Sequence, residues 1–483
     1  SPPWAIAVNG GTLASGAHSA FGLGAPTLSV RGGTFDVGGF IQNFRSVAIS
    51  SGSIVGATAG QLTASSFEST NGGTISANLG GSGVLAKSGP GTLVLSGANT
   101  FGNVSAVGTT VSAGIIRVQK TSALGIGSVN VAAGAAVELE GGITLANDFT
   151  LNGAGASGSG APTGSLRNIS GSNTITGLVT LAGPDSYIGS DAGSLTFDRP
   201  GASTTAIQVS GTMPDFVLGG AGDVVFNDGL NLWNSSAYAN LVKQGSGTLE
   251  INSPSQIGSS LSVVGGTFVY TTQDIFASTG QASKVFVNGA VIRSGVSGTL
   301  SSGNASVGSS TISIGSKGGT WDIPSSINVT SNIPLTGSGS FTKSGAGLLT
   351  LGVANSYAGS TNIMGGTLAV SGGLPGGTAV TVSSGATYSL LANATIGSLS
   401  GNGAVSLNSN TLTTGSDNSS TSYSGVLSGT GGLAKVGSGA FTLSGSNTYS
   451  GPTTVQAGVL AVSGSLSDSS AVSVGSGATY SLL

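Results

Sequence analysis

The 483-residue sequence has no cysteine, one histidine, and only 13 basic and 16 acidic side chains. Without cysteine there is no disulfide and no thiolate metal site, so stability must come from packing and hydrogen bonds. A net charge of -3 with no clustered basic face gives no footprint for nucleic acid. No apolar run approaches the roughly 20 residues of a membrane-spanning helix. We therefore expect no nucleic-acid partner and no membrane span in this segment.

Two motifs could suggest a reactive site, and both have simpler explanations. The single histidine, His18, lies far in sequence from the acid-rich middle and is a poor general base for a serine triad. Residues 153–158 match G-x-G-x-x-G, but that fingerprint requires a strand that leads into a helix. Among 87 glycines a chance match is expected. With no glycine-aspartate calcium repeat either, the sequence predicts no catalytic, cofactor-binding or metal-binding residue, and no cofactor.

One segment recurs along the chain, and its fullest copy runs from Leu433 to Val462. Each copy has a lysine, then two glycines, then an alternating apolar pair such as Phe441 and Leu443. The lysines are Lys87, Lys243, Lys343 and Lys435. Three copies also keep an asparagine with an aromatic residue two positions later: Asn99 with Phe101, Asn355 with Tyr357, and Asn447 with Tyr449. The last two copies are offset by 92 residues at matching positions, and both end in GATYSLL.

The composition of the repeat predicts short strands separated by tight corners. A helix is excluded, because each interior glycine would cost about 1 kcal/mol. A single coil buries too few apolar side chains to offset its backbone entropy, so successive coils must stack. The sequence therefore predicts an all-β parallel β-helix of roughly 20 coils. In the last copy we expect strands at 440–444, 453–456, 459–463, 471–474 and 479–483.

The C-terminal repeats resemble the autotransporter-associated strand repeat of bacterial autotransporter passenger domains. The resemblance is carried by residues 431–435, 437–439, 444–451 and 458–460, and it extends from about Gly337 to the end and around 84–118. It implies a right-handed β-helical passenger, exported across the outer membrane to the bacterial cell surface or the extracellular space. It also implies a translocator barrel outside this segment.

We expect one continuous β-helical domain over 1–483, with a less regular part and wider loops at 153–237. The repeated lysines are several coils apart and cannot converge on one ligand, so we interpret them as exposed charges that keep the shaft soluble. We expect the three asparagines to turn their amides toward backbone groups at corners. The chain ends inside a coil, with Tyr480, Leu482 and Leu483 on an uncapped rung. Either it is a piece of a longer passenger or this end stacks on another molecule.

Two function classes stay open. The first is a non-enzymatic surface shaft acting as adhesin, spacer or self-associating fibre. Its partners would be other copies of itself, a host or neighbouring-cell surface, or extracellular matrix and polysaccharide. The second is a secreted β-helix enzyme that acts on polysaccharide through paired carboxylates. That enzyme would need several charged side chains of the middle region to meet in one groove, whereas the simpler expectation is that the acids form a solvated outer face. The candidate residues are Glu138, Glu140, Arg167, Asp185, Asp191, Asp198 and Arg199.

Overall fold

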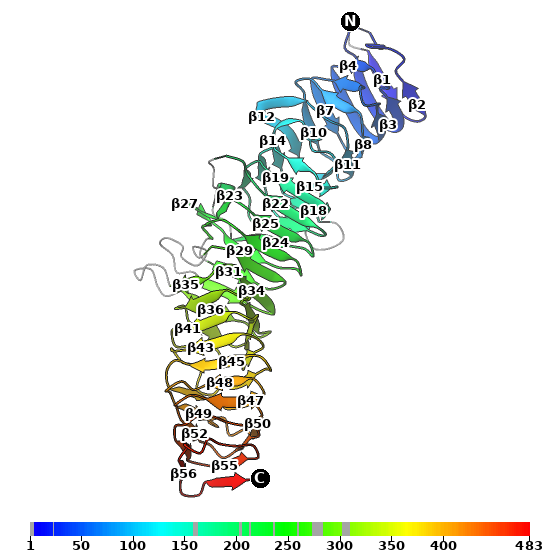
Figure 1. Cartoon of the computed structure of the whole chain (residues 1–483). Coiled ribbons are helices and arrows are strands. Elements are labelled where there is room, and N and C mark those ends of the chain that lie inside the picture. Colours follow the sequence, from blue (N-terminus) through cyan, green and yellow to red (C-terminus); the bar gives the residue numbers. More distant parts are fainter. Residues whose placement is uncertain are drawn as a thin grey trace. The chain divides into compact units, whose positions relative to one another are not determined.

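The computed structural model describes residues 4–22, 24–157, 163–201, 205–211, 214–234, 237–257, 260–272, 284–301 and 310–483. Over these residues the chain is all β, without a helix, and its parallel strands stack as a β-solenoid of about 21 turns (Figure 1). The expected parallel β-helix of roughly 20 coils is confirmed. The chain divides into two compact units, Ser1–Ile257 and Gly258–Leu483, and each is described by itself. One continuous domain stays a prediction.

In the first unit, long N-terminal strands lead into two ladders of short strands. β1 (Ala5–Val8) pairs with β3 (Thr27–Asp36), and β3 pairs with β5 (Ser46–Val55). After β5 the sheet continues as two parallel ladders. The first consists of β7 (Ser66–Ser69), β10 (Val84–Lys87), β12 (Gly102–Val111), β14 (Ile126–Val131), β17 (Phe149–Leu151), β20 (Val179–Leu181), β23 (Thr205–Val209) and β26 (Gly229–Asn231). The second consists of β8 (Gly73–Ile75), β11 (Thr92–Leu95), β13 (Gly114–Val118), β15 (Ala135–Glu140), β18 (Leu166–Ser170), β21 (Ser186–Ser190), β24 (Asp215–Gly219) and β29 (Asn240–Lys243).

Smaller ladders complete the first unit. One consists of β16 (Thr144–Leu145), β19 (Ser172–Ile175), β22 (Ser194–Phe197), β25 (Asp223–Phe226) and β30 (Thr248–Ile251). Another consists of β4 (Ile41–Asn43), β6 (Gln61–Thr63) and β9 (Asn78–Gly80), while β2 (Thr12–Ala14) pairs with β3. The strands β27 (Trp233–Asn234) and β28 (Ala237–Tyr238) pair antiparallel. Strands thus occur throughout the segment 153–237, although residues 158–162, 202–204, 212–213 and 235–236 lie outside the described residues.

In the second unit each coil contributes strands to separate parallel ladders, which form the sides of the solenoid (Figure 1). The longest ladder consists of β32 (Thr267–Tyr270), β34 (Ala290–Ser294), β37 (Gly319–Asp322), β40 (Phe341–Ser344), β42 (Thr361–Ile363), β44 (Ala379–Val382), β47 (Ser398–Gly401), β50 (Thr421–Tyr423), β53 (Ala440–Leu443), β55 (Val459–Val462) and β57 (Thr479–Leu482). The next consists of β35 (Gly298–Leu300), β38 (Asn328–Ser331), β41 (Leu348–Leu351), β43 (Thr367–Val370), β45 (Thr387–Leu390), β48 (Ala404–Ser406) and β51 (Val426–Ser428). The third side carries β31 (Ser260–Val263), β33 (Lys284–Val287), β36 (Thr311–Ile314) and β39 (Leu335–Gly337), and further along β46 (Ala394–Ile396), β49 (Leu412–Thr414), β52 (Leu433–Lys435), β54 (Thr453–Val455) and β56 (Val472–Val474).

The five strands expected in the last repeat are found as β53 to β57, each within one residue of its predicted bounds. Alternate residues of each strand face inward. Phe441 and Leu443 of β53 are buried, whereas Thr442 between them is half-buried on the outer side. The equivalent leucines of the other copies are fully buried as well: Leu93, Leu95, Leu349 and Leu351. The alternating apolar pairs that the sequence shows in the repeat therefore face the core.

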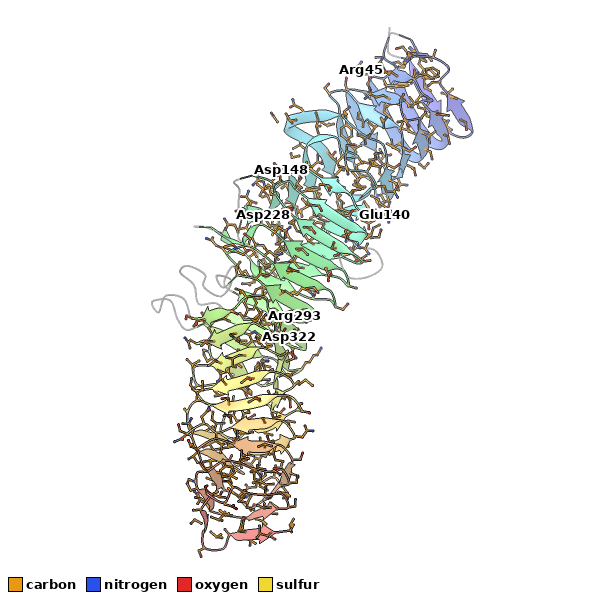
Figure 2. All side chains as sticks on the ribbon, viewed as in Figure 1. Arg45, Glu140, Asp148, Asp228, Arg293 and Asp322 are labelled. Carbon is orange, nitrogen blue, oxygen red and sulfur yellow. The ribbon has the colours of Figure 1, made fainter. Side chains whose placement is uncertain are left out.

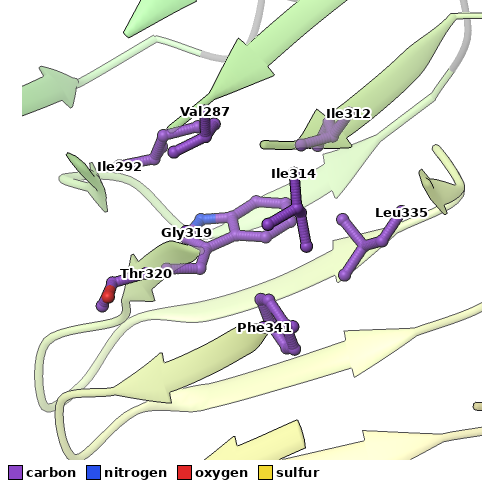
Figure 3. Close-up of a pocket in the computed structure, with 9 residues that line it drawn as sticks. Val287, Ile292, Ile312, Ile314, Gly319, Thr320, Leu335 and Phe341 are labelled. Atoms are coloured by element: carbon purple, nitrogen blue, oxygen red, sulfur yellow. The ribbon is translucent and has the colours of Figure 1, made fainter. Parts of the chain in front are cut away.

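A void in the core of the second unit is too small for a ligand. Figure 3 shows Val287, Ile292, Ile314, Leu335 and Phe341 around a cavity of about 10 Å³, whose lining exposes no polar surface. A void of about that size holds at most one water molecule, which would find no polar partner there. The interior of the second unit therefore offers no binding pocket at this position.

Candidate functional site

The four repeated lysines are buried, which corrects the expectation that they are exposed. Lys87, Lys343 and Lys435 have no exposed surface, and Lys243 retains 3%. Each lysine occupies the inward register of its strand, two residues after a buried apolar side chain such as Phe341 before Lys343. The alternation of the strand therefore carries an ammonium group into the wall of the solenoid.

Each ammonium group donates to backbone carbonyls of its own corner, and those of Lys87, Lys343 and Lys435 donate to a carbonyl of the next coil as well. Lys343 Nζ donates to the carbonyls of Ser344 (2.7 Å), Gly345 (2.8 Å) and Gly365 (3.0 Å). Lys435 Nζ repeats the arrangement with Val436 (2.7 Å), Gly437 (2.9 Å) and Ala457 (3.2 Å). Lys87 Nζ binds the carbonyls of Gly89 and, in the next coil, Ala113. Lys243 Nζ binds those of Gln244 and Gly245. We call this arrangement the lysine clip.

The glycine two residues after the lysine lets the corner form. Gly345 has a φ of 72°, and a Cβ there would lie 2.2 Å from the Ile323 carbonyl oxygen. No other residue fits this left-handed, crowded position without strain. The Lys-x-Gly spacing of the repeat therefore places a glycine where the chain must turn for the corner carbonyls to face the ammonium group.

Burial lowers the pKa of all four lysines. Desolvation brings the pKa of Lys343 and Lys243 down to about 8, opposed in each case by a nearby carboxylate, Asp322 and Asp223 respectively. The pKa values of Lys87 and Lys435 are also lowered by desolvation. Because the amines are enclosed by backbone, their lowered pKa does not make them accessible nucleophiles.

The repeated asparagines hold three consecutive coils together, as expected for amides turned toward corner backbone. Asn355 accepts a hydrogen bond from the Leu335 N–H (3.0 Å) and donates to the carbonyls of Val353 and Gly373 (both 2.9 Å). Asn447 makes the equivalent bonds with Leu427, Gly445 and Ser465. Asn99 does the same across its coils, with Leu79 and Ala123. All three asparagines are buried, so they are structural groups, not ligand-binding ones.

The aromatic residue of the repeat anchors a short hydroxyl chain in two copies. The Tyr357 hydroxyl lies 2.5 Å from Thr361 Oγ1, which is 3.3 Å from Thr378 Oγ1, and Thr378 donates to the Gly359 carbonyl. In the last copy, Tyr449, Thr453 and Ser470 form the same chain. Burial raises the pKa of both tyrosines, against the lowering effect of these hydroxyl partners. The lysine, the asparagine and the aromatic residue of the repeat thus each contribute hydrogen bonds that fix the coil.

A neighbouring tyrosine lacks such a partner, which gives a test of this reading. Tyr388 is fully buried, and its hydroxyl has no hydrogen-bond partner within the described part of the chain. Replacing Tyr388 by Phe removes an unsatisfied buried hydroxyl, so we expect the free energy of unfolding to rise by about 1 kcal/mol. Tyr357→Phe, the matched control, loses a satisfied bond and should lower it by about the same amount. Urea denaturation of both variants measures the difference, and equal effects would contradict the assignment.

The acidic residues of the middle region fall into separate places, and one group forms a ladder of ion pairs. Glu138 on β15 accepts from Arg117 on β13 (2.8 Å) and from Arg167 on β18 (3.0 Å), and Arg167 also binds Asp191 (2.5 Å). The side chain of Glu138 is only 3% exposed, so the expectation that the acids form a solvated face is wrong for this residue. Its two arginines cover it on the outer surface of the sheet. Burial acts to lower the pKa of Arg167, but Asp191 and Glu138 outweigh it and raise the pKa.

The other candidates for an enzyme do not join this ladder. Glu140 accepts from Gln119 (3.0 Å) at the end of β15. Arg199 is held by Asp228, which accepts from its backbone N–H, and by the Thr205 carbonyl. Figure 2 shows Glu140 and Asp228 on different edges of the ribbon. Asp185 and Asp198 are exposed. Of the seven candidates, the structure brings together Glu138, Arg167 and Asp191 only, as an ion-pair ladder and not as a pair of free carboxylates.

The two other motifs of the sequence are the single histidine and the G-x-G-x-x-G match. His18 accepts a hydrogen bond from the Ile41 N–H (2.9 Å) through Nδ1, and its ring lies edge-on to Phe40. The end of the G-x-G-x-x-G match, Gly158, lies outside the described residues, as do 160–162 of the expected loop. Over the described ranges no group of three or more His, Asp or Glu side chains could hold a metal ion. Over the same ranges no helix is long and apolar enough to cross a membrane.

A known family matches the segments of the chain that contain three of the buried lysines. A family model described as the passenger-associated-transport-repeat matches residues 85–118, 341–370 and 433–462. Each match begins two residues before a buried lysine, and it includes the asparagine and the aromatic residue of that copy. No curated protein and no solved structure gives a significant match. The chain is thus a β-solenoid that carries three passenger-associated transport repeats, consistent with an autotransporter passenger domain.

Proposed function

We propose that this chain is a non-enzymatic shaft of an exported passenger, which acts as a spacer or adhesin at the bacterial cell surface. The observation that carries the proposal is the use of its repeated polar groups. The lysines and asparagines bind backbone within the wall, and the strongest charge cluster is internally paired. Groups committed in this way support stacking of coils, and they are not free to bind or transform a substrate.

Export to the surface is supported by the transport repeats and by the lack of cysteine, because a chain without thiols cannot form wrong disulfides in an oxidising compartment. The partners that we propose are a host or neighbouring-cell surface, extracellular matrix or polysaccharide, and other copies of the chain. The outward strand positions, rich in Ser and Thr, suit contacts of modest strength spread over many coils.

The test combines surface exposure with an assay for polysaccharide cleavage. In cells that express the full gene, antibody against the chain should label intact cells, and external protease should remove the signal. The purified chain should release no oligosaccharide or unsaturated sugar from neutral or acidic polysaccharides. Product release that Glu138→Gln or Asp191→Asn abolishes would overturn the non-enzymatic proposal and favour the enzyme with a groove in the middle region. A signal confined to the cell interior would overturn the surface role.

A further inference from the structure

The surface of the second unit is almost free of charge beyond Asp322. From Ile323 to the end the sequence has only four charged side chains, and two of these are the buried lysines of the clips, Lys343 and Lys435. The other two, Asp417 and Asp468, lie in loops between strands. The last exposed ion pair of this unit joins Arg293 and Asp322, which Figure 2 shows beside each other. A protein surface normally relies on net charge to keep copies apart, and this one has little.

One side of the unit combines this lack of charge with a regular row of hydroxyl groups. We define the hydroxyl face as the outward side of β40, β42, β44, β47, β50, β53, β55 and β57. These strands are paired in parallel, so their outward residues fall in register. The central row consists of Thr342, Asn362, Thr381, Ser400, Ser422, Thr442, Ala461 and Ser481. None of the eight is charged, and six carry a hydroxyl group.

The hydroxyl groups of this face are lightly used within the chain. Thr381 and Ser400 share one hydrogen bond of 3.0 Å between neighbouring strands, and Asn362 makes a long contact of 3.5 Å with Ser360. Each hydroxyl group is both a donor and an acceptor, so it retains capacity for a further partner. Met364, at the edge of the row, is 61% exposed and adds an apolar contact.

We propose that the hydroxyl face packs against the hydroxyl face of a second copy of this chain. Hydroxyl rows are self-complementary, because any member can donate to or accept from any other. Both copies have the same strand spacing of about 4.8 Å, so contacts that match at one rung match at every rung. A neutral face also adds no like-charge repulsion. A two-fold axis places the same patch on both partners and closes the dimer.

The size of the face predicts a weak contact. Eight strands at about 4.8 Å give a length of about 40 Å, and three or four residues across give a width of about 12 Å. The area of about 500 Å² per copy is below the roughly 800 Å² per partner of a standard stable interface. Association in solution should therefore be weak, while copies held on one cell surface would meet at a higher effective concentration and pair more readily. The inference deepens the proposed function, on which it rests, by naming the partner and the surface.

Sedimentation velocity of the full chain over a wide concentration range tests this proposal. We expect a reversible dimer that forms only at the high end of the range. The double variant Thr381→Arg with Thr442→Arg places two like charges on the face and should weaken dimerisation at least tenfold. The matched control is Thr350→Arg with Ser389→Arg, at outward positions of β41 and β45 on another side, and it should stay within about twofold of the parent. Circular dichroism verifies that both variants fold.

A charge-swap experiment separates a specific contact from general loss of solubility. The variant Thr381→Asp with Thr442→Asp should be monomeric alone, yet it should form a mixed dimer with the arginine variant. A chain that stays monomeric at every concentration would overturn the proposal, as would equal weakening by the control pair. Retention of the monomeric chain on a neutral glucan, lost in the arginine variant, would instead assign the face to polysaccharide. None of these outcomes depends on catalysis, so the non-enzymatic role is judged separately by product release.

Discussion

Replacing Lys343 by methionine is expected to lower the free energy of unfolding of the second unit by about 2–4 kcal/mol. Methionine keeps most of the length and volume of the lysine side chain but has no hydrogen-bond donor. The carbonyls of Ser344, Gly345 and Gly365 would each lose the ammonium group that they now face. An unsatisfied buried polar group costs about 1–3 kcal/mol, and relief from burying a charge recovers part of the loss. The same change at Lys435 should act alike.

The measurement is urea denaturation together with hydrogen exchange at the corner amides, because a solenoid can open locally without unfolding as a whole. Exchange should accelerate most at the coils on either side of the substitution. Lys317→Met is the control, since Lys317 is exposed and makes no clip. If Lys343→Met and Lys317→Met unfold at the same urea concentration, the clip does not stabilise the wall as the geometry indicates.

The lysine clip also shows where sequence reasoning was sufficient and where it was not. The repeat, the strands and the inward column of Phe441 and Leu443 follow from period-two alternation and glycine spacing, and the structure confirms them. The same alternation places Lys343 inward, two residues after Phe341. Exposure is nevertheless the ordinary expectation for a lysine, because a lysine is almost never fully buried unless it is paired. Its partners are backbone carbonyls of the following corner and coil, which the sequence does not display.

The ion-pair ladder was missed for a related reason. Glu138 lies on the outer side of β15, where a carboxylate is ordinarily solvated. It is buried because Arg117 and Arg167 occupy the same register on the strands before and after it. These residues are 21 and 29 positions from Glu138 along the chain. To predict that these three residues are neighbours, one must know the length of each coil. Coil lengths vary through the middle region, so the sequence does not give the register. The fold could be predicted from the sequence, but this juxtaposition could not.

Raising the pH is expected to unfold the second unit between about pH 10 and pH 12, because its buried tyrosines must remain neutral. Burial raises the pKa of Tyr270 to about 12, with Ser294 and Trp321 acting in the opposite direction. Burial raises the pKa of four further tyrosines: Tyr357, Tyr388, Tyr423 and Tyr449. Below about pH 10 these groups are neutral in both the folded and the unfolded chain. Above it the unfolded chain releases their protons first, so the free energy of unfolding falls with pH.

The buried lysines act in the opposite direction over a lower range of pH. In the second unit, burial brings the pKa of Lys343 down to about 8 and also lowers the pKa of Lys435, so these groups lose their protons in the folded chain at a pH where the unfolded chain still keeps them, up to about pH 10.4. The cost of burying their charge is therefore fully present below about pH 8 and is relieved as the pH rises through that value. The two effects together predict a shallow maximum of stability between about pH 9 and pH 10 and a steep loss above it.

The loss of stability above pH 10 should be steep. Each tyrosine held neutral in the fold removes about 1.4 kcal/mol of stability per pH unit once the unfolded chain is ionised, and five of them act together in one unit. Tyrosinate absorbance and far-ultraviolet circular dichroism should therefore change in one cooperative step above pH 10. Tyr388→Phe and Tyr423→Phe remove two of the groups and should move that step to higher pH. Gradual ionisation of all tyrosines near pH 10, with the β signal intact, would show that the side chains are open to solvent and that the coils are not closed around them.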